Sequence, residues 1–301
     1  MRVQVEKFIS KKDIKVSWGE SHLYIPTPYE LEDRLRVFVS IWDKNSIGRV
    51  GYVDLDKITF SVIGYSEQPS LNIGSPGQFD ERGVTPMSLI YHKKVLFLFY
   101  TGWGNKPNYP YTLLTGLAYS VDHGKTFYRV DKNPILHPSN DMSIVKTAAF
   151  VKLIGNRLKM WYVGGENWTW VNGKHTPTYN LRTTESVCIY SWTGQTKEIL
   201  KAAPDRQEFA LGRPWVNTTD KGYELFISAR TRNKGYMLTR AVSSDGNQWI
   251  RKDDSISVEE TSLNNEMTCF SSFITLNNQE YLLYNGNQYG KDGFFISKCI
   301  R

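Results

Sequence analysis

Two acidic residues stand shortly before strand-like runs of the sequence and could act together as a catalytic pair. Asp80 follows Phe79 and comes just before Gly-Val-Thr-Pro, and Glu266 precedes the run Met-Thr-Cys-Phe-Ser-Ser-Phe. Paired carboxyl groups suit glycosyl chemistry, because one protonates the leaving oxygen while the other activates water or attacks the anomeric carbon. We predict Asp80 as the base or nucleophile and Glu266 as the acid. The alternative is that each carboxylate only accepts hydrogen bonds within a turn.

A second set of polar and aromatic residues would bind the substrate around this pair. A histidine can bond a sugar hydroxyl or titrate near neutral pH, an arginine can bind an anionic group, and tryptophan rings can form the floor of a sugar site. Each of these residues also has a structural alternative, in the core, in an ion pair or in solvent. The predicted substrate-binding residues are His22, Asp43, Trp103, Lys146, Trp168, Glu185, Arg213, Arg230 and Asn285.

The elements that would position these residues are short aromatic and β-branched runs between Gly, Asn and Asp turns, a pattern typical of strands. Equivalent runs recur every 57–65 residues, centred on Ser40, Tyr100, Tyr162, Ile227 and Tyr284. Each has a partner run upstream, and several have further runs downstream. Repeated units of three or four antiparallel strands are typical of propeller blades, which bury their faces by stacking around an axis.

We therefore predict an all-β fold, a five-bladed β-propeller that forms a single domain over residues 1–301. An irregular β-sandwich with accidental spacing is the alternative. In a propeller the first strand of each blade lines the central channel. Charged residues near the start of each upstream run would then meet in one funnel; they are Glu20, His22, Asp80, Arg82, Lys146, Glu208, Arg213 and Glu266.

Composition limits the partners of the chain. Its 301 residues are 40% hydrophobic, enough for a large core, and the formal net charge is +7. The positive charge favours anionic small molecules mildly, and without a dense basic run we expect no nucleic acid partner. No apolar run is long enough to span a membrane. The N-terminal residues also lack the uninterrupted apolar region of a signal peptide, so we expect a cytoplasmic protein.

Cofactor and metal signatures are missing from the sequence. The three cysteines, Cys188, Cys269 and Cys299, have no metal-ligand spacing and fit a reducing compartment. The sequence has no phosphate-binding loop, dinucleotide fingerprint or zinc-protease motif. We therefore expect neither a metal nor a cofactor, and leave open a central ion such as calcium, which has no ligand signature in the sequence. The Ser-x-Asp-x-Gly-type turns at 120–127 and 243–249 would stabilise blade edges rather than take part in chemistry.

Several motifs carry a resemblance to a known group of proteins. They are Ser-His-x-x-x-Pro-Thr-Pro (21–28), Gly-x-Phe-Asp-x-x-Gly-Val-x-Pro (77–86), Arg-Pro (213–214), Asn-Glu-Met (265–267) and Tyr-Asn-Gly-Asn-x-Tyr-Gly (284–290). With them the chain resembles five-bladed propeller proteins related to glycoside hydrolases of the arabinanase, xylosidase and fructosidase types and to mannoside phosphorylases. It looks closest to uncharacterised surface-polysaccharide cluster proteins similar to the N-terminal domain of glucosamine inositolphosphorylceramide transferases.

The resemblance implies a carbohydrate-active protein with three carboxylates on the first strands of early, middle and late blades. Asp80 and Glu266 match in kind, but the first blade offers His22 and Glu20, and the third offers Lys146 in place of an acid. We expect a glycoside hydrolase-like protein that cleaves or transfers a glycosyl unit, with a carbohydrate or sugar nucleotide as ligand. The departures leave open a non-catalytic glycan-binding module in surface-polysaccharide assembly, or a scaffold that binds protein.

Overall fold

Strands make up most of the computed structural model, which describes residues 1–107, 109–136 and 144–301. In these ranges the single α-helix is α1 (Asn287–Gly290), and three short 3-10 turns interrupt the connections. No helix in the described ranges is long and apolar enough to cross a bilayer. The predicted all-β fold is confirmed.

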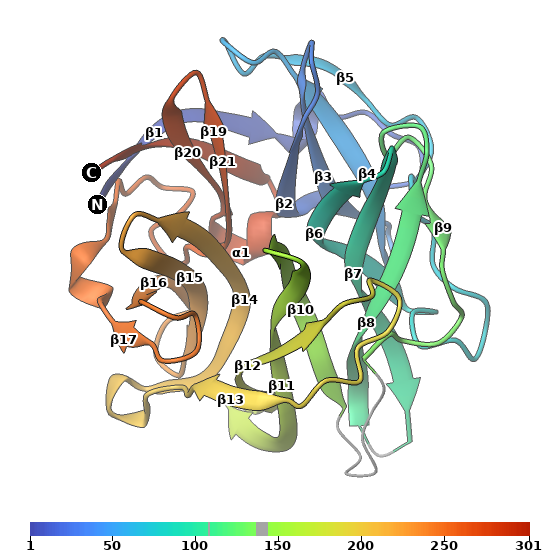
Figure 1. Ribbon diagram of the computed structural model, residues 1–301. Coiled ribbons are helices and arrows are strands. Elements are labelled where there is room, and N and C mark those ends of the chain that lie inside the picture. Colours follow the sequence, from blue (N-terminus) through green and yellow to red (C-terminus); the bar gives the residue numbers. More distant parts are fainter. Residues whose placement is uncertain (108, 137–143) are drawn as a thin grey trace.

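The strands form antiparallel meanders that follow one another along the chain and lie around a common centre (Figure 1). The strands are β1 (Arg2–Ser10), β2 (Ser21–Glu30), β3 (Leu35–Trp42), β4 (Gly48–Leu55), β5 (Val62–Tyr65), β6 (Gly83–His92), β7 (Val95–Lys106), β8 (Tyr109–Ser120), β9 (Tyr128–Arg129), β10 (Val145–Ile154), β11 (Arg157–Val171), β12 (Lys174–Ser186), β13 (Lys197–Leu200), β14 (Glu208–Thr219), β15 (Gly222–Thr231), β16 (Tyr236–Ser243), β17 (Ile250–Arg251), β18 (Ser257–Val258), β19 (Cys269–Leu276), β20 (Gln279–Asn285) and β21 (Gly293–Ile300).

Hydrogen bonding groups these strands into sheets of five, twelve and four strands within the described ranges. The twelve-stranded sheet is continuous because short parallel contacts join β8 to β10 and β12 to β14. The five-stranded sheet combines both ends of the chain, since β1 pairs antiparallel with β21. The sheet order does not itself separate the strands into five blades, so the blade count and the single-domain assignment stay predictions.

The strands nearest the centre contact one another in a closed ring. β2 contacts β6, β6 contacts β10, β10 contacts β14, β14 contacts β19, and β19 contacts β2. Each of these inner strands pairs with the strand that follows it in the chain. The predicted runs centred on 40, 100, 162, 227 and 284 all lie on those second strands, which are β3, β7, β11, β15 and β20.

Every inner strand carries a β-bulge at a similar point. The pairing register shifts between Tyr24 and Thr27 on β2, and comparable shifts interrupt β6, β10, β14 and β19. The bulged residues in four of these strands have positive φ angles although none is glycine; they are Ile25, Ala148, Arg213 and Phe270. A bulge bends a strand and re-aims a side chain, so these positions direct residues toward the centre.

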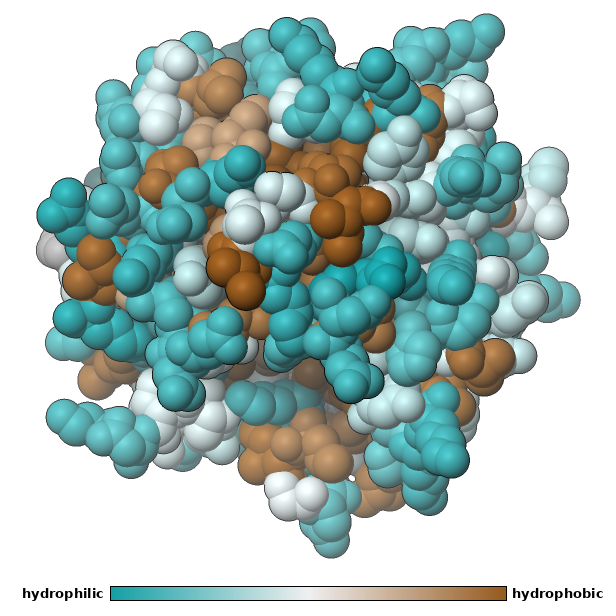
Figure 2. Space-filling model, turned by 90° about the horizontal axis from the view of Figure 1, so that it is seen from above, coloured by the Kyte–Doolittle hydropathy of each residue, from teal (hydrophilic) through white to brown (hydrophobic). Residues whose placement is uncertain are grey.

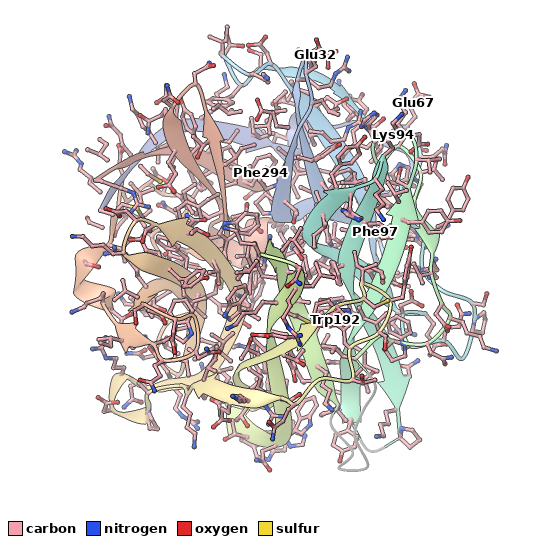
Figure 3. All side chains as sticks on the ribbon, viewed as in Figure 1. Glu32, Glu67, Lys94, Phe97, Trp192 and Phe294 are labelled. Atoms are coloured by element: carbon pink, nitrogen blue, oxygen red, sulfur yellow. The ribbon has the colours of Figure 1, made fainter. Side chains whose placement is uncertain are left out.

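The hydrophobic core lies between neighbouring meanders. Val39 of β3 packs in one cluster with Leu283 of β20 and Phe294 of β21, and Phe97 packs in another with Trp192. Figure 3 shows Phe294 inside the molecule, while the charged residues it labels lie toward the margin. The surface seen in Figure 2 is mostly hydrophilic with scattered hydrophobic groups. A further cluster lies at the centre of the ring itself and includes Ile25, Met87 and Phe270 of the inner strands.

Candidate functional site

A pocket of about 250 Å³ lies where the bulges of the inner strands meet. One bulge residue from each inner strand lines it: Ile25, Met87, Ala148, Arg213 and Phe270. Segments more than 240 residues apart in the sequence therefore build one cavity. Most small-molecule sites have this composition, with mainly apolar and aromatic walls and a few polar groups that fix the orientation of the ligand.

Arg213 is the most deeply buried charge in this pocket. Its residue is only 2% exposed, and its guanidinium donates one recorded hydrogen bond, from Nη2 to Thr27 Oγ1 at 3.2 Å. Its Nε and Nη1 are buried without a hydrogen-bond partner among the described residues. Burial lowers the pKa of Arg213 to about 9. A buried, under-bonded guanidinium at a pocket wall can bind an anion through its planar fork.

A second arginine, Arg230 of β15, lines the pocket inside a group of aromatic rings. Its guanidinium carbon lies 5.3 Å from the ring centre of Phe209 and 5.5 Å from that of Tyr236. Burial opposes its charge, but the surrounding tyrosines, Tyr236 foremost, hold the pKa of Arg230 above its usual range. The hydroxyls of Tyr236 and Tyr179 are hydrogen-bonded at 2.6 Å. The rings thus hold the guanidinium in place while it keeps its charge.

Tryptophan and tyrosine rings form another part of the pocket wall. Trp103 donates from Nε1 to Thr85 Oγ1 at 3.2 Å and lies 5.3 Å from the Tyr111 ring. Trp42, another lining residue, is stacked on the His22 ring with centroids 3.8 Å apart. Burial lowers the pKa of His22 to about 4, so this ring is neutral at pH 7. His22 therefore supports the wall from behind Trp42.

A larger pocket of about 560 Å³ adjoins the central one, because Arg230 and Tyr289 line both. Tyr289 belongs to α1, which lies near the centre in Figure 1. Glu266 lines this adjoining pocket. Its own backbone N–H donates to Asn287 Oδ1 at 2.9 Å, which ties the Glu266 loop to α1.

The relatives with a similar sequence are described only as uncharacterized proteins, so they give no function for these pockets. No family model matches the chain. The uncharacterized proteins Rv1502 and MT1551 of Mycobacterium tuberculosis (strains ATCC 25618 / H37Rv and CDC 1551 / Oshkosh) are each 26% identical to it over 287 residues. The alignments cover 94% of this chain and 94% of each relative.

Several solved structures with a similar fold are described as glycoside hydrolases. One described as a glycoside hydrolase superposes with a TM-score of 0.71 at 14% identity, covering 99% of this chain and 93% of that one. A thermostable family-43 glycoside hydrolase gives 0.66 at 13%, covering 93% and 89%. A structure from the GH130 family of mannoside phosphorylases gives 0.69 at 15%, covering 93% and 85%. The chain shares the propeller fold of these proteins, and identities this low show the fold alone.

The structure places the two predicted catalytic residues apart. Asp80 is fully buried and lines neither pocket; its carboxylate accepts hydrogen bonds from Arg129 at 2.8 Å and from the Tyr100 hydroxyl at 3.0 Å. Glu266 is exposed and lines only the adjoining pocket. Asp80 thus has the surroundings of a buried ion pair, and the two carboxylates do not share a cavity.

Three of the predicted substrate-binding residues, Trp103, Arg213 and Arg230, line the central pocket. Two others lie just behind its wall: His22 is stacked on Trp42, and Trp168 lies 5.5 Å from Tyr111. Lys146 is buried on β10 beside the lining residue Thr147, and its backbone oxygen accepts from Thr115 Oγ1. These six residues therefore line the central pocket or lie next to its wall, and their role in binding stays a prediction.

The remaining three predicted residues have structural partners elsewhere. Asp43 pairs with Arg49 at 2.8 Å and accepts two backbone N–H groups of its own turn. Glu185 pairs with Arg157 and Lys159. Asn285 is fully buried and bonds three backbone groups, those of residues 23, 25 and 293. None of the three lines either pocket.

Sequence reasoning missed most of the aromatic lining. Tyr111, Tyr179, Tyr236 and Tyr289 come from β8, β12, β16 and α1 rather than from first strands. Nothing in the repeat distinguishes these tyrosines from core residues. The bulge residues did carry a signal, because Pro26 and Pro214 directly follow Ile25 and Arg213 at equivalent points of the repeat. No cluster of three or more metal-ligating side chains exists among the residues the structure describes.

Proposed function

We propose that the chain is a single-domain, five-bladed β-propeller, residues 1–301, that binds an anionic carbohydrate in its central pocket. The closed ring of contacts among β2, β6, β10, β14 and β19 supports five blades. In that arrangement β1 completes the last blade by pairing with β21. The fold likeness to glycoside hydrolases supports a carbohydrate ligand.

The observation that carries the proposal is the buried, incompletely bonded guanidinium of Arg213 in an aromatic pocket. A buried guanidinium with unfilled donor positions is costly, and a ligand carboxylate that reaches it would supply the missing acceptors. None of the described residues that line the central pocket is acidic. The pocket therefore lacks the negative charge that a ligand would bring, while rings such as Trp103 offer apolar faces to a sugar ring.

Hydrolysis by two carboxylates fits this geometry less well. That mechanism needs two carboxyl groups about 5–10 Å apart beside the glycosidic bond. Asp80 is engaged by Arg129, and of the two predicted acids only Glu266 lines the adjoining pocket. A second candidate function is cleavage or transfer of the bound glycosyl unit with Glu266 as the acid. This second candidate is favoured because Glu266 lines the adjoining pocket, which shares Arg230 with the central pocket.

Two finer assignments belong to the same proposal. We propose that the ligand is a sugar unit of surface-polysaccharide metabolism, supplied as a glycan or as a sugar nucleotide. This agrees with the motif likeness to polysaccharide-cluster proteins and to the N-terminal domain of glucosamine inositolphosphorylceramide transferases. If Glu266 does not act on the bond, the chain is a glycan-binding module of that pathway.

Calorimetric titration with glucuronate, glucose 1-phosphate and methyl glucoside tests the proposal. We expect saturable binding of the two anionic sugars, much weaker binding of the neutral one, and loss of glucuronate binding in Arg213→Met. The matched control is Arg157→Met, which removes an exposed arginine outside both pockets. Equal binding of charged and neutral sugars, or full glucuronate binding by Arg213→Met, contradicts the proposal. Mass spectrometry of wild type and Glu266→Gln incubated with activated sugars decides between turnover and binding alone.

A further inference from the structure

The adjoining pocket has a different chemical character from the central one. Its walls come from the β11–β12 hairpin, the loop after β15 and the loop before β19. These segments contribute the side chains of Lys174, Lys234, Asn172, Asn233 and Asn265, together with Glu266. The central pocket is mostly apolar and aromatic, whereas this one is mostly polar and at about 560 Å³ is the larger of the two.

The balance of charge in the adjoining pocket is positive. Lys174, Lys234 and the shared Arg230 carry three positive charges, and Glu266 carries one negative charge. Amide side chains and backbone add hydrogen-bond donors at the same walls. A group with one negative charge would neutralise only part of this positive charge, whereas a phosphate group brings up to two negative charges and several acceptor oxygens.

Arg230 links the two pockets physically. Phe209, which flanks its guanidinium, lines the adjoining pocket, and Tyr236, which flanks it too, lines the central one. A ligand group bound at Arg230 therefore sits at the boundary, one side toward the aromatic pocket and the other toward the lysines. That is where the bond between a sugar and its phosphate would lie.

We propose that the adjoining pocket is a phosphate subsite, and that it holds a phosphate group next to the glycosyl unit in the central pocket. This inference rests on the proposed function and names the ligand class as the glycosyl phosphate or diphosphate of an acidic sugar, whose own carboxylate faces Arg213 in the central pocket. Arg230 contacts the phosphate nearest the sugar, and Lys174 and Lys234 neutralise its outer oxygens as point charges. Glu266 opposes the anion and sets a limit on its affinity.

The test compares charge-matched lysine variants at constant ionic strength. In Lys174→Gln/Lys234→Gln, we expect the affinity for glucose 1-phosphate and for uridine diphosphate glucose to fall at least tenfold while glucuronate binding changes less than twofold. The control Lys93→Gln/Lys221→Gln removes two exposed lysines outside both pockets and should leave all three affinities unchanged. Glu266→Gln should raise phosphate-ligand affinity about threefold. These exposed positions leave the fold intact.

The outcomes separate the subsite from the proposed function. The phosphate subsite is refuted if the double lysine variant binds the phosphate ligands as tightly as the wild type, or if the control variant loses the same affinity. In either case, glucuronate binding that depends on Arg213 would still support the central pocket. Inorganic phosphate is the probe for the source of the group. If it binds alone with the same lysine dependence, the subsite stands with free phosphate as its ligand; if only the sugar-linked forms bind, the phosphate is part of the glycosyl ligand.

Discussion

Replacing Arg213 with methionine should make the unliganded protein more stable and strongly weaken glucuronate binding. Two donor positions of its guanidinium, Nε and Nη1, are buried without a partner among the described residues. Each such group costs roughly 1–3 kcal/mol. Methionine has similar length, is flexible and fills irregular space. The hydroxyl of Thr27, which loses its arginine donor, still donates to the Ile25 carbonyl at 3.2 Å.

These terms predict a gain of about 2 kcal/mol in the free energy of unfolding, using the lower value for each donor. At about 2 °C per kcal/mol for a chain of this size, the melting temperature rises by about 4 °C. Two charge-assisted hydrogen bonds lost to the ligand reduce affinity by about 100-fold or more. Urea unfolding and calorimetric titration, carried out on wild type, Arg213→Met and Arg157→Met, measure both quantities.

The reasoning is refuted if Arg213→Met is less stable than the wild type and binds glucuronate equally well. That result would mean that the guanidinium stabilises the ring of strands and has no ligand. A stability gain with loss of binding is typical of residues kept for function at the expense of stability. The surface variant Arg157→Met should change neither quantity by much, since exposed ion pairs contribute little.

Three further predictions test residues around the pocket. The pKa of His22 is about 4 in the folded chain, whereas an unperturbed histidine has a pKa of 6.5. As the pH falls, the unfolded state therefore binds a proton before the folded state does. The free energy of unfolding should drop between pH 6.5 and 4, by about 1–2 kcal/mol at pH 5. Urea unfolding of His22→Asn should show a weaker drop, and the exposed His92→Asn should behave as wild type. Asp80→Asn should destabilise the chain by about 3 kcal/mol, because it breaks a buried ion pair. Its affinity for sugars, measured by calorimetric titration, should not change. A stable variant that no longer binds sugar would show that Asp80 belongs to the binding site. Trp103→Ala should weaken sugar binding about tenfold through loss of a pocket wall, and exposed Trp170→Ala should not; equal effects would place the sugar elsewhere.

The repeat in the sequence predicted the inner and second strands well, because period-2 patterning and turn residues are local properties. Arg213 and Trp103 reach the pocket for the same reason, since both belong to the paired strands nearest the centre. Asp80 shows where such reasoning stops. Its partner Arg129 is 49 residues away, on β9. A carboxylate in a turn can face a pocket or an arginine of an outer strand. The local sequence does not distinguish these two cases.

The tyrosines of the site were beyond prediction for a related reason. Tyr179 and Tyr236 lie on third strands, and they meet only because β12 and β16 of neighbouring meanders approach the same point. That approach depends on the twist of each sheet and on the bulges of the inner strands, which are tertiary properties. The sequence shows that the tyrosines suit a strand but not that their hydroxyls meet beside Arg230.

The bulges also connect the fold to the pocket energetically. Residues with side chains rarely adopt positive φ, and each such residue costs about 1 kcal/mol; Ile25, Ala148, Arg213 and Phe270 all do so at the centre. Cores are usually free of such strain, and it persists only where the surroundings impose it, which is common at binding sites. Here the same conformation aims four side chains into one cavity. The recurrence of strain at equivalent points of the ring is therefore independent support for a binding site at this centre, separate from the charge of Arg213.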